Sequence, residues 1–183
     1  MLEMKRKVDA HMIAIMGLLI ALMVILSQVL GIETQFVKLT FTFVPEVVMA
    51  ILFGPFWTGV GAAIADVTGL MLLPKAAPYF FGFTINAFIG GLVYGYFFYK
   101  KEITWLRSFL CVLTNTLVIT LCLTPIWLSI MYQVPLDSWA LWSVRLLKAG
   151  IMLPIETILV YLVAKSLPYK RFAKRFIAKG EAN

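Results

Sequence analysis

Apolar stretches long enough to cross a lipid bilayer follow one another along almost the whole chain, and they limit what it can fold into. A helix needs about 20 consecutive apolar residues to cross the hydrocarbon core, where every backbone polar group must be hydrogen-bonded within the protein. Hydrophobic residues make up 62% of the 183 residues, and charged residues only 14%. The sequence therefore predicts an all-α integral membrane protein.

Six of these stretches are predicted to be transmembrane helices, one of them short. They cover residues 10–30, 44–53, 56–73, 82–99, 103–132 and 136–167. The second and third are joined by Phe53-Gly-Pro-Phe56, a turn signal, and form either a hairpin or one broken span. We find no internal repeat, linker or low-complexity segment. Residues 1–183 are therefore expected to form one membrane domain.

The basic residues predict the orientation of the chain. Most of the 16 Lys and Arg residues cluster before the first predicted helix, between the fourth and fifth, and after the sixth. Six spans place these clusters on one side of the membrane, whereas five would separate the two terminal clusters, against the positive-inside rule. Both termini are predicted to be cytoplasmic. The net charge of +7 follows from this topology, and no compact basic domain suggests nucleic-acid binding.

Three charged residues, Arg145, Lys148 and Glu156, lie inside the last apolar stretch. A charge near the middle of a bilayer costs at least ~2.5 to 3.5 kcal/mol, so it normally has a partner, an aqueous cavity or a ligand. At about 100° per residue, all three fall on one helix face. Glu156 lies about 16 Å along the axis from Arg145. We expect it in the inner half, fixing helix packing or a partner contact.

Four basic residues predicted in the outer half suggest an anion site. Lys38, Lys75, Arg145 and Lys148 surround a region rich in Phe and Tyr, which suits an anionic aromatic molecule. Asp66, near the middle of the third predicted helix, has two interpretations. It either pairs with Arg145 or Lys148 as an internal salt bridge, or it belongs to the site.

Two loops on the predicted outer side have unusual sequences. Residues 36–43 alternate polar and apolar side chains with the period of a strand, and residues 74–81 are aromatic with one lysine. The loops between the first and second and between the third and fourth helices could together form a lid over a cavity that opens outward. The alternative is that they only anchor the protein in the membrane interface.

Small residues one helical turn apart allow helix backbones to approach closely. The third and fourth predicted helices contain Gly61-x-x-x-Ala65-x-x-x-Gly69 and Ala87-x-x-x-Gly91-x-x-x-Gly95, which we expect to pack within this protein. The first helix contains Gly17-x-x-x-Ala21. That pair either packs internally or docks against another membrane subunit.

No catalytic or metal-binding motif is present. The sequence lacks a Gly-x-x-x-x-Gly-Lys-Ser/Thr loop, a Gly-x-Ser-x-Gly elbow and a His-Glu-x-x-His zinc motif, and its only histidine is His11. We expect no enzymatic activity, metal or cofactor. If the chain takes part in active transport, another subunit must hydrolyse ATP.

Five motifs, in order along nearly the whole chain, resemble the folate-type substrate-binding membrane subunits (S components) of energy-coupling factor (ECF) vitamin transporters. They are Phe53-Gly-Pro-Phe-Trp-Thr-Gly59, Asp66 followed by Gly69, Tyr79-Phe-Phe-Gly-Phe-Thr84, Trp127-Leu-Ser-Ile-Met-Tyr132 and Arg145-Leu-Leu-Lys-Ala-Gly-Ile-Met-Leu-Pro-Ile-Glu156. The chain departs from the pattern at Thr124-Pro-Ile126, where a folate binder is expected to have an Asn-Thr pair.

The resemblance implies a six-helix vitamin-binding subunit of the bacterial plasma membrane, with an outer pocket closed by the loops after the first and third helices. Such a subunit docks through an Ala-x-x-x-Ala face of its first helix, represented here by Gly17 and Ala21. Its partners would be a transmembrane coupling protein (EcfT) and two cytoplasmic ATPases, and it is thought to topple in the membrane to release its cargo. The expected cargo is folate or a reduced folate.

The resemblance and the positions of polar and aromatic residues together suggest a binding site. Aromatic rings would pack on the pteridine, basic residues would attract the dicarboxylate tail, and a polar pair would bond the pteridine edge. In that order the candidates are Tyr79, Phe80, Phe81 and Trp127; Lys38, Lys75, Arg145 and Lys148; and Asp66 and Asn86.

Three alternatives stay open. Another S-component cargo, such as a pyridoxine-type vitamin or a hydroxymethylpyrimidine, would need fewer basic residues. An intramembrane enzyme acting on lipid would need paired catalytic groups at one depth, for which Asp66 and Glu156 are a poor pair. A structural membrane subunit would bind no vitamin.

Overall fold

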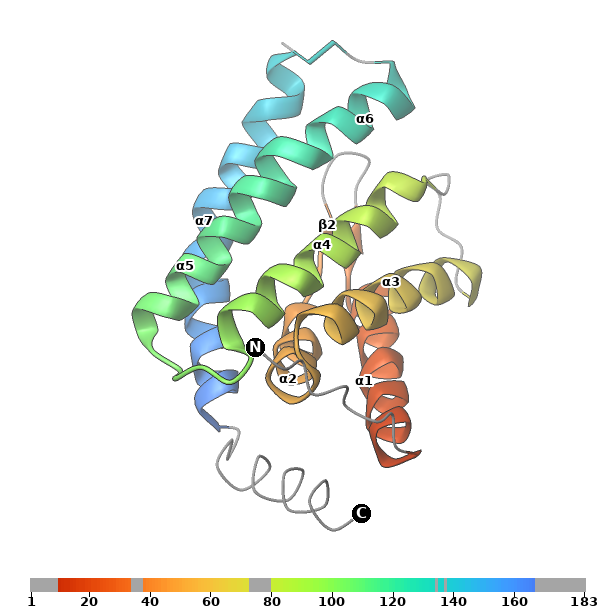
Figure 1. The fold of residues 1–183 in the computed structure, drawn as a ribbon. Coiled ribbons are helices and arrows are strands. Elements are labelled where there is room, and N and C mark those ends of the chain that lie inside the picture. The colour runs from red at the N-terminus through yellow and green to blue at the C-terminus, as the bar shows by residue number, and fades with distance from the viewer. Residues whose placement is uncertain (1–9, 34–37, 73–79, 134, 137, 167–183) are drawn as a thin grey trace, which may run out of the picture.

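The computed structural model describes residues 10–33, 38–72, 80–133, 135–136 and 138–166. The fold is a bundle of helices with a short π-helical segment and one two-stranded ribbon (Figure 1). The elements are α1 (Ala10–Gln28), β1 (Ile32–Glu33), β2 (Lys38–Leu39), α2 (Phe43–Phe53), α3 (Pro55–Leu72), α4 (Phe81–Phe98), α5 (Trp105–Asn115), η1 (Thr116–Leu123), α6 (Thr124–Tyr132) and α7 (Trp139–Ser166). The predicted all-α fold is confirmed.

Five stretches of the described chain are long and apolar enough to cross a membrane, and α2 is a shorter apolar helix. The five are α1, α3, α4, the continuous unit of α5, η1 and α6 over Trp105–Tyr132, and Trp142–Ser166 within α7. The predicted boundaries lie within three residues of the observed ones. The six-span count and the cytoplasmic termini stay predictions.

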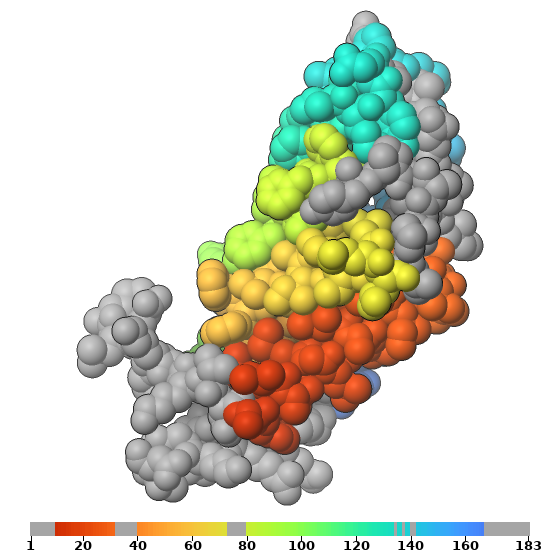
Figure 2. Space-filling view, turned by 90° about the vertical axis from the view of Figure 1, so that its right-hand side faces the viewer, coloured from red at the N-terminus to blue at the C-terminus, as the bar shows by residue number. Residues whose placement is uncertain are grey.

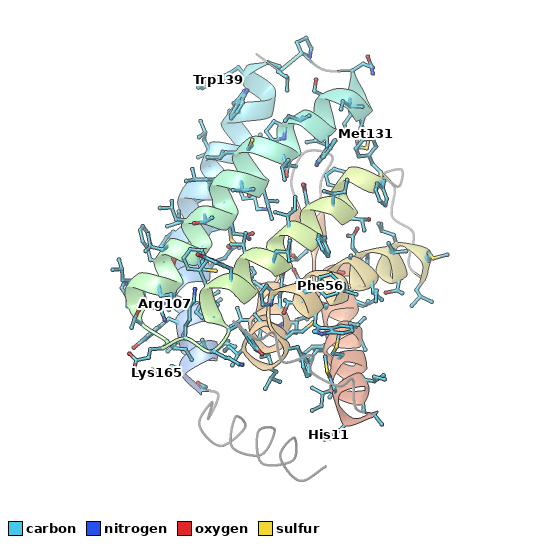
Figure 3. The ribbon with its side chains drawn as sticks, in the orientation of Figure 1. His11, Phe56, Arg107, Met131, Trp139 and Lys165 are labelled. Atoms are coloured by element: carbon cyan, nitrogen blue, oxygen red, sulfur yellow. The ribbon has the colours of Figure 1, made fainter. Side chains whose placement is uncertain are left out.

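The two ends of the bundle differ in character. Arg107 and Lys165 lie toward the same end as His11, whereas Met131 and Trp139 lie at the opposite end (Figure 3). The predicted topology requires this separation of basic residues from the Trp139 end. We call the Trp139 end outer and the Lys165 end inner, following that topology.

Helix α2 is separated from α3 by a single residue. Gly54 has φ of 87°, a left-handed conformation that favours glycine, and the Tyr99 ring lies 3.2 Å from where a Cβ would be. The next residue, Pro55, begins α3. In Figure 1, α2 is seen almost end-on and α3 runs across the picture. The two helices are therefore a sharply bent pair and not one continuous span.

Glycines bring the α3 and α4 backbones together. A Cβ at Gly91 would lie 2.6 Å from the backbone nitrogen of Gly59, and one at Gly95 would meet the backbone of Pro55. These contacts confirm the predicted internal packing of the small residues in α4. Close backbone approach stabilises helix pairs in a bilayer because burial of apolar side chains gives no advantage over lipid.

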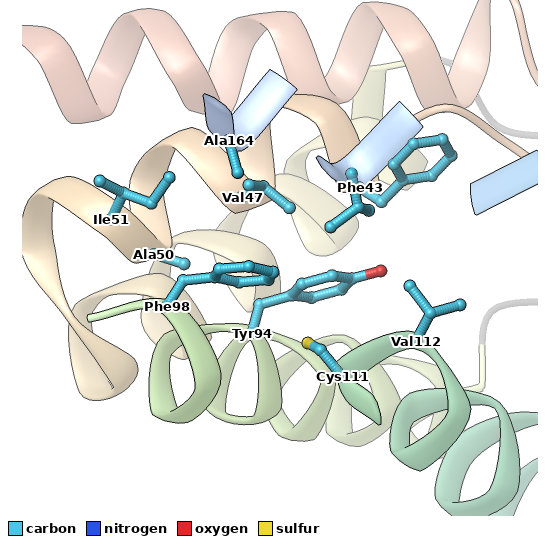
Figure 4. Close-up of a cluster of buried hydrophobic side chains, with 10 residues drawn as sticks. Phe43, Val47, Ala50, Ile51, Tyr94, Phe98, Cys111, Val112 and Ala164 are labelled. Carbon is cyan, nitrogen blue, oxygen red and sulfur yellow. The ribbon is translucent and has the colours of Figure 1, made fainter. Parts of the chain in front are cut away.

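Helix α2 lies between two apolar clusters. One cluster includes Val47 with Tyr94, Phe98 and Val160, from α4 and α7, and Figure 4 shows the Tyr94 and Phe98 rings side by side. The other includes Met49 of α2 with residues of α1 and α3. Because α2 contacts α1, α3, α4 and α7, its side chains are central in the bundle. This position places an acidic residue of α2, Glu46, inside the protein.

Candidate functional site

A polar cavity of about 190 Å³ lies among α2, α4, α5, η1 and α7. Polar side chains in an apolar bundle generally mark a ligand site, an ion pathway or a water-filled space. The lining residues are Thr40, Thr42, Phe43, Glu46, Tyr94, Asn115, Thr116, Ile119, Thr120, Lys148, Ala149, Met152 and Glu156.

One face of α7 forms a wall of this cavity. Lys148, Met152 and Glu156 are spaced four residues apart, so they lie on one side of the helix and all contact the same space. The shared face that the sequence predicted for Lys148 and Glu156 is confirmed. Glu156 was expected to lie apart from the anion site, but it lines the same cavity as Lys148, which extends along two turns of α7. The different roles expected for the two residues stay a prediction.

Arg145 lies one turn outward from Lys148 and is buried, with only 2% of its surface exposed. Its Nη1 donates a hydrogen bond of 3.3 Å to the backbone carbonyl of Thr120 in η1. Thr120 itself lines the cavity. A guanidinium so fixed holds a positive charge beside the outer part of the cavity.

The π-helical segment η1 supplies the opposite wall. Thr116, Ile119 and Thr120 face the cavity from it, and the Thr124 hydroxyl donates to the Ile119 carbonyl at 2.6 Å. The segment ends at Leu123, and Pro125 is the second residue of α6, where it has no N–H to continue the wider hydrogen-bond pattern. Such wide turns occur frequently at functional sites. The sequence predicted one continuous helix here, and Pro125 was the only signal of the irregular turn.

An amide-centred cluster lies outward of the cavity. The buried Asn86 side chain donates to the Thr124 hydroxyl at 3.1 Å and accepts from Trp127 Nε1 at 3.0 Å. The Trp127 ring lies 5.9 Å from the ring of Phe80. Three predicted site residues, Asn86, Trp127 and Phe80, are thus brought together by α4 and α6. The bonds to Asn86 fix the orientation of the indole ring.

Asp66 joins α3 to α4. Its carboxylate accepts a 2.9 Å hydrogen bond from the hydroxyl of Thr84, which is buried. Asp66 is not among the residues that line the cavity. The structure therefore gives this carboxylate a hydrogen bond that joins α3 to α4, and its pairing with Arg145 or Lys148 stays a prediction.

Phe81 is not among the described residues that line the cavity. It is 64% exposed at the start of α4, and within the described part of the chain its ring makes no contact like that of Phe80 with Trp127. Lys38 lies in β2, where its backbone pairs with Glu33. Lys75 and Tyr79 lie outside the described residues.

The predicted outer lid can be followed only in part. The chain after α1 folds back as an antiparallel ribbon, in which Ile32 pairs with Leu39 and Glu33 with Lys38. The strand pattern read over residues 36–43 is shorter in the structure, because Phe43 already begins α2. The loop of residues 73–79 lies outside the described residues, so closure of a lid stays a prediction.

Sequence analysis missed four of the polar lining residues, Glu46, Tyr94, Asn115 and Glu156. Glu46, Asn115 and Glu156 are polar residues within apolar stretches, which is a signal for function, but nothing in the sequence shows that they meet. Tyr94 gave no signal. Within the described part of the chain, no group of three or more His, Cys, Asp or Glu could hold a metal ion.

A second surface, on α1, is a candidate for contact with a partner protein and not with the substrate. Gly17 and Ala21 are exposed on α1, and a Cβ at Gly17 would meet nothing within 4 Å. The N-terminal part of α1, red in Figure 2, lies on the outside of the bundle. This small-residue face therefore makes no close helix contact within the described structure.

Comparisons with known proteins agree over most of the chain. The family described as "ECF transporter, substrate-specific component" matches residues 11–164. A folate transporter FolT of Clostridium novyi (strain NT) is 37% identical over 146 residues, 80% of this chain and 83% of the relative. A folate transporter FolT of Leuconostoc mesenteroides subsp. mesenteroides is 30% identical over 177 residues, 94% of each chain. A crystal structure of FolT bound with folic acid has a TM-score of 0.83 and 49% identity, covering 87% of this chain and 95% of that one.

Proposed function

Because this chain belongs to the substrate-specific components of ECF transporters, we propose that it captures folate or a reduced folate outside the cell and delivers it inward. It is a multi-pass protein of the bacterial plasma membrane and a transporter subunit, not an enzyme. The observation that carries the choice of cargo is the likeness, in both sequence and fold, to FolT bound with folic acid.

The site geometry supports an anionic aromatic cargo. Lys148 lines the cavity and Arg145 lies buried one turn outward, so both can attract the carboxylates of a glutamate tail. Phe80 and Trp127 offer rings against which an aromatic part of the vitamin can pack. Asn86 contributes by holding Trp127 in place. Lys38, Lys75 and Tyr79 are proposed to complete the site from the loops.

We propose that transport requires docking of the α1 face at Gly17 and Ala21 onto a transmembrane coupling protein driven by two cytoplasmic ATPases. Two observations support this. The chain belongs to the family of substrate-specific components, which implies such a module. The small-residue face of α1 also has no neighbour within 4 Å of a Cβ at Gly17 in the described structure. A glycine at the first position preserves close approach of a partner helix.

A vitamin panel tests the proposed cargo. Calorimetry on the purified full chain in detergent would compare folate, a reduced folate, pyridoxine and hydroxymethylpyrimidine. We expect saturable binding of folate or the reduced folate and none of the other two. Tight binding of pyridoxine or hydroxymethylpyrimidine, with no binding of folates, would contradict the proposal.

A further inference from the structure

Aromatic and basic side chains meet where the start of α5 lies beside the end of α7. The Trp105 ring packs edge-on against the Tyr161 ring of α7, with ring centroids 5.4 Å apart. One turn after Tyr161, Lys165 places its Nζ 5.3 Å from the centre of that ring and 3.2 Å from its hydroxyl. We call Trp105, Tyr161 and Lys165 the α5–α7 corner. It lies at the inner end, and none of its three residues lines the cavity described above.

The positive charge of the corner is not neutralised within the described part of the chain. The hydrogen bond and the ring contact of Lys165 both go to Tyr161, which is a neutral group. An ammonium group has three N–H donors, so donors remain for an acceptor from outside the protein. Two lysines of the turn between α4 and α5, Lys100 and Lys101, also lie over tyrosine rings. This end of the bundle therefore combines positive charge with aromatic rings.

The sequence that follows α7 adds further positive charge. Residues 167–183 contain five Lys and Arg residues and one Glu. In the predicted topology this end faces the cytoplasm, and the cytoplasmic leaflet of a membrane carries anionic lipid that attracts basic residues. The corner is thus expected to lie at the surface where anionic headgroups are present.

An exposed apolar surface begins beside the corner. Leu106, the second residue of α5, is 65% exposed, and Leu162 of α7 is 52% exposed. One helical turn outward from them, Leu110 and Ile158 are exposed as well. A ligand that fits both parts has an anionic group next to long apolar chains. A phospholipid with a net negative charge has this chemistry.

We propose that the α5–α7 corner binds the headgroup phosphate of an anionic phospholipid, with Lys165 as the cation and the acyl chains along the exposed apolar residues of α5 and α7. Trp105 and Tyr161 suit this role, because amphipathic rings favour the membrane–water interface. A zwitterionic headgroup fits less well, since its ammonium group would lie near Lys165 and none of the three corner residues is acidic. The inference does not depend on which vitamin is the cargo.

The corner is separate from the proposed docking face. Helix α1 packs on α2 and α3, whereas α5 packs on α4 and α7. A lipid at the corner therefore stays in place while α1 contacts a partner. Because it contacts the ends of both α5 and α7, it should stabilise their packing without changing folate affinity.

Fluorescence quenching by brominated lipids tests the site locally. The purified full chain in detergent would be titrated with brominated phosphatidylglycerol, which is anionic, and with brominated phosphatidylcholine, which is zwitterionic. The contribution of Trp105 is the difference between the unmodified protein and Trp105→Phe. We expect saturable quenching of Trp105 by phosphatidylglycerol, with roughly fivefold tighter binding than phosphatidylcholine, the effect of one basic residue at an anionic surface. Equal quenching by the two lipids would overturn the proposal.

Two variants separate a specific site from general charge attraction. Lys165→Gln removes the proposed cation, so the preference for phosphatidylglycerol at Trp105 should disappear. Arg107→Gln is the matched control, because it also removes one positive charge at the inner end. Arg107 lies about 200° round α5 from Trp105 and donates to the Glu102 carbonyl, so its variant should keep the preference. Equal loss in both variants would show general attraction only and overturn the proposed site.

Thermal unfolding gives a second readout. Phosphatidylglycerol should raise the unfolding midpoint of the unmodified protein and of Arg107→Gln more than that of Lys165→Gln, because a ligand that binds the folded state stabilises it. An equal rise in all three would contradict the proposal. Size-exclusion chromatography shows whether each variant is folded. If Lys165→Gln does not fold, the comparison of the two lipids on the unmodified protein decides alone.

Discussion

Arg145 is a charged residue buried within an apolar helix, and the structure shows one way in which it is accommodated. Its Nη1 donates to the Thr120 carbonyl, within the π-helical segment that forms a wall of the cavity. A charged hydrogen bond of this kind offsets part of the cost of burial. Positive charge is thereby held beside the cavity.

Replacement of Arg145 with alanine should weaken folate binding at least tenfold, or by about 1.4 kcal/mol, because the proposed attraction for the tail is lost. Calorimetry with the purified variant measures this change. Arg107→Ala is the control, since Arg107 is only partly buried, lies at the inner end and donates to the Glu102 carbonyl. Unchanged affinity in Arg145→Ala would remove this residue from the site.

A substitution at Trp127 measures how much the fixed orientation of its ring contributes to folate affinity. Trp127→Phe keeps an aromatic ring but removes the indole N–H that bonds Asn86. One hydrogen bond contributes about 0.5–1.5 kcal/mol, so folate affinity should fall roughly two- to tenfold. Trp105→Phe serves as control, because Trp105 packs on Tyr161 at the inner end. Equal folate affinities for the two variants would show that the Asn86 contact does not position a binding ring.

At the scale of helices, the close approach of α3 and α4 depends on glycine. Gly91→Ala would place a Cβ 2.6 Å from the Gly59 nitrogen, where backbone atoms on both sides limit relief. Overpacking of this kind typically costs about 1–3 kcal/mol, so thermal stability in detergent should fall.

A matched substitution on α7 provides the comparison. A Cβ at Gly150 would meet nothing within 4 Å, and alanine favours a helix over glycine, so Gly150→Ala should leave stability unchanged or slightly raised. Thermal unfolding followed by fluorescence-detected size-exclusion chromatography measures both. Similar midpoints for the two variants would show that the α3–α4 contact tolerates a larger separation.

The helices also show where pattern reasoning reaches its limit. The spans were predictable because each is a long apolar run bounded by turn residues or charges. The π-helical segment before Pro125 could not be predicted. An apolar run has the same composition whether its backbone hydrogen bonds join residues four or five positions apart. The sequence pattern also extended a strand to Phe43, but in the structure Phe43 is already the first residue of α2.

For the whole molecule, binding and transport should be separable. Gly17→Leu fills the open face of α1 without contacting the cavity, so folate affinity of the isolated subunit should be unchanged. Docking to the coupling module should be weakened, because a bulky side chain prevents close helix approach. Co-purification with the module and folate uptake in cells are the two measurements.

Gly150→Leu makes the same change on α7 and should leave uptake near that of the unmodified protein. Normal uptake and co-purification in Gly17→Leu would contradict the proposed docking face. Loss of folate binding in the isolated Gly17→Leu subunit would instead show that α1 influences the site.

The sequence by itself determined the all-α membrane fold, the approximate ends of the helices and the family, because these depend on local runs and motifs. It also placed Lys148 and Glu156 on one helix face, since helical periodicity is a local property. Only the tertiary structure brought Glu46 and Asn115 to the same cavity and Asn86 to Trp127, 41 residues away. These contacts depend on how a short, bent α2 and the helices around it pack, and packing joins residues that no local pattern relates.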